Sequence, residues 1–371
     1  MQIYERYSEL LEQPFGIEIL ERLRKDRRVN DMDGKLLYLG ASGSRFDVNN
    51  LAMWYLSVWN DQSKERADQA LEDYLDRDTY PVTKALWVKG IELSEAVEVA
   101  NEISIVSIHE MPMSSDKINF LRQRLQCQAP DPVPIPEAAI IINCEVPKYA
   151  SPAEDSLFWS IEEDLLALAW LLNLLPRVSC TPFYSTCYAE DVPFGIFGGS
   201  GGGLPLSDVP GGRARKISDE SFEELRQYFG CYQSKKTGEW RRIQFALKRF
   251  SQARRRDEVE DIILDLCISL EMLLLNDNDN NNQLSLAFRL RGSWLIAESD
   301  IERVEIFKQL KDLYNYRSQV AHSGMLCKNK PNKIVNVRKQ VRGFIEIAER
   351  ILRKVILDGT PDWTKLVLNV K

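Results

Sequence analysis

The chain has 371 residues, of which 44% are hydrophobic and 28% charged, and its formal net charge is −7 with only two histidines. This length allows one large domain or two smaller ones, and the 19 glycines and 16 prolines exclude a fibrous or disordered chain. Two histidines exclude a site built from three or more of them, and the net negative charge alone argues against a nucleic-acid partner.

The cysteines indicate a reduced, intracellular protein. They number seven, an odd count, and no two form a C-x-x-C pair, so we expect neither a disulfide framework nor a structural zinc site. The first residues are polar and lack the basic and apolar segments of a targeting peptide. The longest nearly apolar run, 165–175, is about half of the roughly 20 residues that cross a bilayer. We therefore expect a cytoplasmic protein with no membrane partner.

Residues 1–175 predict a mixed α/β domain. Helical patterns cover 4–28, 63–74, 114–126 and 156–175, and strand patterns cover 35–39, 85–88, 103–106 and 138–146. The first of these strands ends at a turn over 40–43, and the last is apolar enough to be buried on both faces. This half carries no family signature, and we expect it to be a sensor or regulatory domain.

Residues 176–216 are rich in glycine and proline. Eight glycines lie between Gly195 and Arg213, together with Pro205 and Pro210. A phosphate-binding loop holds its backbone amides ahead of a helix, but no Gly-Lys-Ser/Thr follows and the prolines interrupt the way to the next helix. The composition favours a flexible linker or surface flap over a nucleotide loop.

From residue 217 to 371 the pattern predicts an all-α bundle, which makes the whole chain α+β. Apolar residues recur at spacings of three and four within 240–253, 259–274, 284–295, 301–314 and 334–355. The fourth stripe includes Ile301 and Val304 and is opened by Ser299 and Glu302, which form a capping box. The asparagine-rich segment 276–282 lacks the glycine and glutamate of a calcium loop and predicts a solvated connection.

Two arginines interrupt these apolar stripes. Arg291 lies between Phe288 and Trp294, and Arg317 continues the line of Leu310 and Leu313. An unpaired buried charge costs several kcal/mol, so each arginine needs a partner. For Arg291 we favour a structural ion pair, for which Glu271 on the preceding helix is available.

Arg317 differs because His322 follows it by five residues. In an undistorted helix, five residues of about 100° each would separate the two side chains by about 140°. The two side chains can converge if the helix ends within the motif, which Gly324 permits. Alternatively, two copies in a symmetric dimer complete each other's site.

Four segments around this pair carry a family resemblance. They are WRRIQFALKRF at 240–250, DLCISLEMLL at 265–274, the helix around Arg291, and YNYRS at 314–318 with VAHSG at 320–324. In this order they resemble the HEPN superfamily, and most closely its Apea-like branch in prokaryotic antiviral defence. The resemblance covers about 220–357 and none of the first 200 residues.

The resemblance implies a homodimeric endoribonuclease that needs no metal and no cofactor. Arg317 would hold the scissile phosphate, and His322 would remove the 2′-hydroxyl proton, leaving a 2′,3′-cyclic phosphate. Ser318, Glu271 and Arg291 would support the site, although many members carry Asn, Asp or His where this chain has Ser318. The protein would be a toxin-like effector of phage defence, with a phage-derived trigger or regulatory partner at the N-terminal domain.

The charge distribution independently favours RNA as a partner. Residues 213–256 hold 13 Lys and Arg against 5 Asp and Glu, and 311–371 hold the same numbers, so each segment carries +8. Residues 1–212 carry −15 and 257–310 carry −8. Basic faces attract phosphate backbones without reading sequence, although a solvated face paired with the acidic 257–310 segment remains an equal alternative. The candidate RNA-binding residues are Arg241, Arg242, Lys248, Arg249, Arg254, Arg255 and Arg256.

Two other functions stay open. The superfamily includes members without nuclease activity, so this domain could instead serve dimerisation or nucleic-acid binding. The N-terminal half could itself be an enzyme, but it shows no nucleophile constellation or phosphate loop. The second histidine, His109, has no cysteine or histidine near it in sequence and is expected to be a surface or core residue.

Overall fold

A computed structural model describes the chain except for residues 1–7, 39–42, 112–116, 118–119, 122–135, 151, 190–191, 194–199, 204–214, 235–237, 276–282, 327–330 and 369–371. The chain forms two compact units. Unit 1 comprises residues 1–89, 93–166 and 182–205, and unit 2 comprises 90–92, 167–181 and 206–371. Unit 1 contains the main sheet and unit 2 is mainly helical, so the α+β class is confirmed.

The N-terminal part of unit 1 is a group of short helices. They are α2 (Pro14–Lys25), α3 (Arg27–Asn30), α4 (Val48–Asp61) and α5 (Lys64–Asp76), with a hairpin of β1 (Leu36–Tyr38) and β2 (Gly43–Arg45). The single helix predicted over 4–28 is wrong, because Pro14 opens α2 and Asp26 accepts a hydrogen bond from the Arg28 amide to cap α3. Helix α4 was not predicted. The predicted turn over 40–43 falls mostly outside the described residues.

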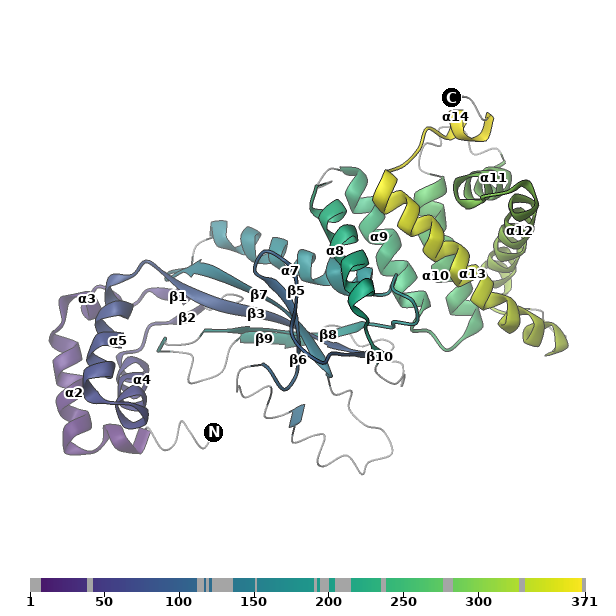
Figure 1. Ribbon diagram of the computed structural model, residues 1–371. Helices are drawn as coiled ribbons and strands as arrows, with labels where there is room; N and C mark the ends of the chain where they lie inside the picture. Colours follow the sequence, from purple (N-terminus) through teal and green to yellow (C-terminus); the bar gives the residue numbers. More distant parts are fainter. Residues whose placement is uncertain are drawn as a thin grey trace. The chain divides into compact units, whose positions relative to one another are not determined.

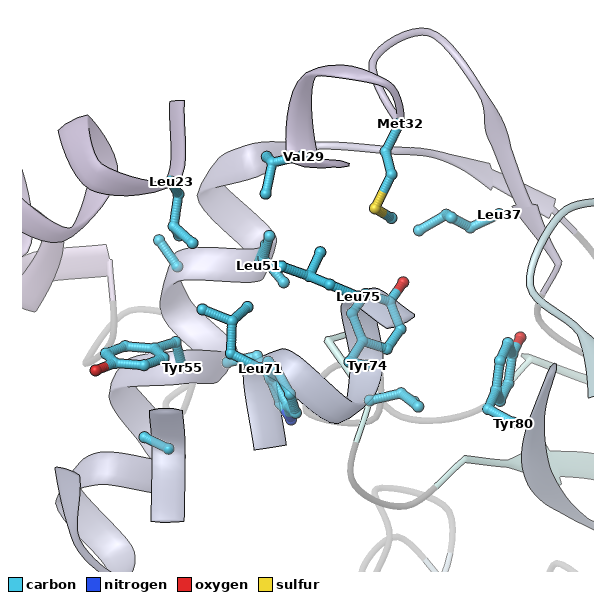
Figure 2. Packing of buried hydrophobic residues seen from close by; sticks show 14 of the residues in the cluster. Leu23, Val29, Met32, Leu37, Leu51, Tyr55, Leu71, Tyr74, Leu75 and Tyr80 are labelled. Carbon is cyan, nitrogen blue, oxygen red and sulfur yellow. The ribbon is translucent and has the colours of Figure 1, made fainter. Parts of the chain in front are cut away.

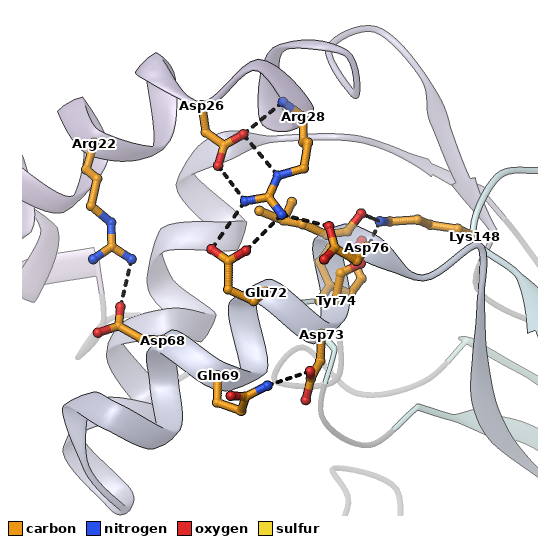
Figure 3. Close-up of polar contacts among 11 residues, drawn as sticks. Arg22, Asp26, Arg28, Asp68, Gln69, Glu72, Asp73, Tyr74, Asp76 and Lys148 are labelled. Carbon is orange, nitrogen blue, oxygen red and sulfur yellow. Dashed lines mark hydrogen bonds and ion pairs between the residues drawn. The ribbon is translucent and has the colours of Figure 1, made fainter.

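These helices share one apolar core. Figure 2 shows Leu23, Leu51, Leu71 and Tyr74 within the cluster that the helices build with β1 and β3. On the surface, Arg28 joins Asp26, Glu72 and Asp76 at 2.7–3.0 Å (Figure 3). The Lys148 ammonium donates to the carbonyls of Tyr74 at 2.6 Å and Leu75 at 3.2 Å near the end of α5. Burial lowers the pKa of Lys148 to about 8.

A six-stranded sheet forms the rest of unit 1 (Figure 1), in the order β5-β6-β7-β3-β8-β9. The strands are β3 (Thr79–Lys89), β5 (Val97–Ala100), β6 (Ile103–Ser107), β7 (Ala138–Pro147), β8 (Thr181–Tyr188) and β9 (Ser200–Gly203), and α7 (Pro152–Leu172) connects β7 to β8. The strands predicted at 85–88, 103–106 and 138–146 are confirmed. Burial of the last on both faces is wrong beyond Ile140, because Asn143 and Glu145 are exposed.

Residues 176–216, predicted to be a flexible linker or surface flap, contain two strands of the main sheet. Strands β8 and β9 both lie in this segment, and Ser200–Gly203 of the glycine run pairs antiparallel with β8 at the sheet edge. The other residues of the run at 198–203, Gly198 and Gly199, lie outside the described residues. Most of the helix predicted at 114–126 lies outside them as well.

Unit 2 is a helical bundle with a two-stranded sheet of β4 (Ile91–Glu92) and β10 (Arg215–Lys216). Its helices are α8 (Asp219–Ser234), α9 (Gly238–Ala253), α10 (Val259–Leu274), α11 (Leu284–Ile296), α12 (Asp300–Ser323), α13 (Pro331–Asp358) and α14 (Trp363–Leu368). Helix α10 contacts α9, α11, α12 and α13 and buries Leu266, Leu270 and Leu273 completely. Burying one such leucine side chain stabilises the fold by about 1.5–3 kcal/mol. Helix α10 lies at the centre of the bundle because four other helices pack against it.

The five predicted helices of the bundle are present, and the capping of α12 is confirmed. The Ser299 hydroxyl accepts a hydrogen bond from the Glu302 amide at 3.2 Å, while the Glu302 carboxylate accepts one from the Glu298 amide at 2.7 Å. The predicted burial of Ile301 and Val304 is wrong, because they are 86% and 54% exposed. Both lie on the side of α12 away from Leu310 and Leu313. Within the described residues, no helix is long and apolar enough to cross a membrane.

Candidate functional site

The predicted catalytic pair lies on one unbroken helix. Helix α12 runs from Asp300 to Ser323, and Gly324 ends it in the left-handed conformation with φ of 69°. The Gly324 amide donates to the Val320 carbonyl at 2.8 Å, so the helix ends after His322 and not within the motif. The expectation that Arg317 and His322 converge through an early helix end is therefore wrong. At about 100° per residue their side chains diverge by about 140°.

Arg317 faces the neighbouring helix α10. Its Nη2 lies 3.5 Å from Oε2 of Glu271, and its guanidinium carbon lies 5.9 Å from the centre of the Tyr314 ring. The Arg317 and Glu271 side chains are 35% and 22% exposed, so the pair is partly screened from water. Burial raises the pKa of Glu271, and the positive charge of Arg317 opposes that rise. Glu271 thus holds the arginine in place between α10 and α12.

Arg291 contacts Leu274 and Trp363, whereas Glu271 was its predicted partner. Its Nη1 donates to the Leu274 carbonyl at 2.7 Å, at the end of α10, and its guanidinium lies 5.2 Å from the centre of the Trp363 ring. A cation near the carbonyl end of a helix is favourable because it meets the negative end of the helix dipole. Glu271, the predicted partner of Arg291, lies against Arg317 instead. These two contacts of Arg291 link α11 to the end of α10 and to α14.

His322 lies in the last turn of α12 and is exposed, whereas Ser318 is half-buried one turn earlier. Neither side chain has a hydrogen-bond partner among the described residues. The His322 imidazole is therefore open to a ligand, while the Arg317 guanidinium already has a carboxylate partner. Within one chain, the Arg317 guanidinium and the His322 imidazole therefore point to different sides of α12.

Most of the predicted RNA-binding residues contact protein groups. Arg249 and Arg256 both pair with Asp265, which is 5% exposed, at 2.9 and 3.1 Å. Arg254 lies 3.3 Å from Glu349 and donates to the Val178 carbonyl at 2.7 Å. Burial lowers the pKa of Arg254, although its charged partner opposes this. For Arg249 and Arg256 the structure supports the alternative of pairing with the acidic 257–310 segment.

The other four residues of this set divide into two kinds. Arg242 donates to the Thr360 hydroxyl at 3.0 Å, and Arg255 donates to the Ser251 carbonyl at 3.1 Å. Arg241 and Lys248 are exposed on α9. Only these last two present a cationic side chain fully to solvent, so α9 is less suited to a phosphate backbone than its sequence indicates.

The Glu271–Arg317 pair is the feature that sequence reasoning missed. Glu271 lies between Leu270 and Leu273, so it interrupts the stripe of α10 just as Arg317 interrupts that of α12. Two opposite charges that each interrupt an apolar stripe on helices of one bundle are a signal for pairing. Sequence alone could not choose between Arg291 and Arg317 as the partner, because the packing of α10 against α11 and α12 decides it.

The remaining sequence candidates show no second site. His109 is exposed in a turn where its amide donates to the Ser107 hydroxyl at 3.3 Å, in agreement with a surface residue. The described residues contain no group of three or more His, Cys, Asp and Glu that could hold a metal ion.

Comparisons with family models, curated proteins and solved structures give no match for the chain.

Proposed function

We propose that this protein is a metal-independent endoribonuclease that acts as a homodimer. The observation that carries the proposal is the uninterrupted helix α12, which presents an exposed histidine and a carboxylate-held arginine five residues apart. One chain cannot bring these two groups to the same phosphate, because they diverge by about 140°. A second copy can supply the missing group, since a two-fold axis places the same helix twice at one interface.

The chemistry follows from the two side chains. The His322 imidazole takes the proton of a ribose 2′-hydroxyl, and the 2′-oxygen attacks the adjacent phosphorus. The bond from phosphorus to the 5′-oxygen breaks, and that oxygen takes up a proton and leaves as a hydroxyl. The guanidinium of Arg317 from the second copy stabilises the charge that develops on the phosphate oxygens. The products are a 2′,3′-cyclic phosphate and a 5′-hydroxyl end.

RNA would have to compete with Glu271 for the guanidinium of Arg317. Arginine carries five donors, so a phosphate can occupy some of them while Glu271 keeps others. The Glu271 contact, at 3.5 Å, is long for a charge-assisted hydrogen bond and leaves that capacity free. Glu271 is then a positioning residue, which fixes the arginine toward the phosphate.

The biological role we propose is that of a toxin-like effector of antiviral defence in the cytoplasm. Unit 1 would receive a phage-derived trigger or a regulatory partner, and unit 2 would cleave RNA. This role rests on the resemblance of residues 220–357 to HEPN domains. It is supported by the helical fold of unit 2 and by the position of Arg317 and His322 on α12, which packs against α10 and α11.

Cleavage assays test the proposal. Wild-type protein in EDTA is expected to cleave single-stranded RNA and leave cyclic phosphate ends, whereas H322A and R317A are expected to lose at least about 100-fold in rate. Ser323→Ala, a neighbouring change on the same helix, serves as the matched control. Equal cleavage by the wild type, H322A and R317A would contradict the proposal.

A second candidate is a non-catalytic module that mediates dimerisation or nucleic-acid binding. It is favoured by the internal pairing of Arg317 with Glu271 and of Arg249 and Arg256 with Asp265, which are contacts of a structural kind. This candidate predicts RNA binding that weakens with salt, no strand cleavage, and no growth phenotype on substitution of His322.

A further inference from the structure

The exposed face of α12 carries one line of residues that ends at His322. Its members follow each other at spacings of four, three, four, three and four along the helix, and in order they are Val304, Lys308, Lys311, Asn315, Ser318 and His322. At about 100° per residue, these six positions fall within an arc of about 80°. Ser318 is half-buried and the other five are exposed. We call this line the α12 stripe.

The two lysines of the stripe differ from the arginines of α9. Neither Lys308 nor Lys311 forms an ion pair or a hydrogen bond with the described residues, whereas Arg249 and Arg256 share Asp265. Glu305 and Asp312 lie nearby on α12, and the Glu305 carboxylate accepts from Gln309 at 3.2 Å. The ammonium groups of the stripe are therefore available to an anion from solution.

The spacing along the helix suits an extended polyanion. With a rise of about 1.5 Å per residue, Lys311 and Lys308 lie about 16 and 21 Å from His322 along the axis. A single phosphate could not reach both a lysine and the imidazole, but a strand several nucleotides long could. Flexible lysine stems contact phosphates as point charges, without reading the bases.

We propose that the α12 stripe binds the sugar–phosphate backbone of single-stranded RNA, with Lys308 and Lys311 each contacting a phosphate and leading the strand to His322. This inference rests on the proposed function and names the residues that position its substrate. An unpaired strand fits because its backbone can follow one helix face and turn its 2′-hydroxyl toward the imidazole.

The competing occupant of this face is a second copy of the chain. Ile301 and Val304, exposed at the start of α12, could pack against the partner's helix. Around Lys308 and Lys311 the two lysines argue against that arrangement, because a two-fold axis there would bring like charges together, whereas the proposed shared site needs the partner only near His322. The oligomeric state is therefore measured alongside RNA binding.

The test uses full-length protein and a single-stranded RNA made uncleavable by 2′-deoxy substitution. Fluorescence anisotropy gives the association constant at several salt concentrations for the wild type, K308A/K311A and K354A/K365A. The last variant removes the same formal charge from exposed lysines of α13 and α14 in the same unit. Each lost contact to a single-strand phosphate lowers the slope of log K against log salt by about 0.7.

K308A/K311A is expected to flatten that slope by about 1.4, while K354A/K365A leaves it unchanged. The inference is overturned if the wild type does not bind, if both variants flatten the slope equally, or if neither does. It is also overturned if light scattering shows that K308A/K311A changes the oligomeric state. Because the probe strand cannot be cleaved, these results are independent of whether the wild type is a nuclease.

Discussion

At the scale of single residues, Glu271 and Arg317 share a partly buried space between α10 and α12. The carboxylate is desolvated, so burial raises its pKa even though a guanidinium lies 3.5 Å away. Desolvation therefore outweighs the attraction of the ion pair at this carboxyl. Burial shifts the pKa of Glu271 and of Lys148, and each shift predicts how stability changes with pH.

Glu271→Gln removes the charge and keeps the shape. A carboxyl whose pKa is raised on folding stabilises the fold below its ordinary pKa of 4.5, and that contribution disappears as the pH rises through the folded value. Urea unfolding of the wild type should therefore lose stability relative to E271Q as the pH rises above about 4.5. If E271Q instead falls behind the wild type over that range, the pair with Arg317 dominates and the assignment of the pKa shift is wrong.

For Lys148 the predicted change of stability with pH has the opposite sign. Its folded pKa of about 8 lies below the ordinary value of 10.5, so the folded state gives up its proton first and stability rises with pH between the two values. Relative to Lys148→Met, the wild type should gain on the order of 2 kcal/mol in unfolding free energy between pH 7.5 and 9.5. A constant difference between the two proteins would show that Lys148 stays protonated near the carbonyls of Tyr74 and Leu75.

At the scale of elements, three arginines of α9 and of the turn that follows it, Arg249, Arg254 and Arg256, pair with carboxylates of the same unit. Asp265 on α10 pairs with Arg249 from α9 and with Arg256 from the turn, so one buried carboxylate links the first half of α10 to the preceding helix and turn. The sequence shows only a basic run followed by an acidic one. In the folded chain, Arg249 and Arg256 of the basic run pair with Asp265 of the acidic run.

Asp265→Asn tests this role. Removing one partner of a buried pair leaves uncompensated charge, and the partial exposure of the two arginines reduces the cost to on the order of 2 kcal/mol. Glu258→Gln, at the exposed N-cap of α10, should change the unfolding free energy by less than about 0.5 kcal/mol. Equal stability of D265N and the wild type would return Arg249 and Arg256 to the candidates for RNA binding.

The sequence predicts elements better than it predicts which faces of them are buried. The α12 helix and its Ser299 cap were predictable from local hydrogen-bonding chemistry, which acts within four residues. The exposure of Ile301 and Val304 was not, because periodicity shows an apolar stripe but not how far a neighbouring helix extends along it. The partner of Glu271 was missed for the same reason: the choice between Arg291 and Arg317 depends on packing between helices distant in sequence.

At the scale of the whole molecule, the net charge of −7 averages over segments of opposite sign. Pairing within unit 2 neutralises part of its basic charge, as in Arg249, Arg254 and Arg256, so segment totals overstate the charge open to a partner. The exposed cations that remain include Lys308 and Lys311 on the helix that bears His322. A dimer would present that helix twice, as the proposed shared site of Arg317 and His322 needs.

Mixing two inactive variants tests the central claim most directly. R317A and H322A each lack one group, but a mixed dimer has one site with Arg317 from one copy and His322 from the other. Random pairing of equal amounts should restore about a quarter of the wild-type cleavage rate, because half of the dimers are mixed and each has one of two sites. Each variant alone should stay inactive, and an inactive mixture of variants shown to exchange subunits would contradict a shared site.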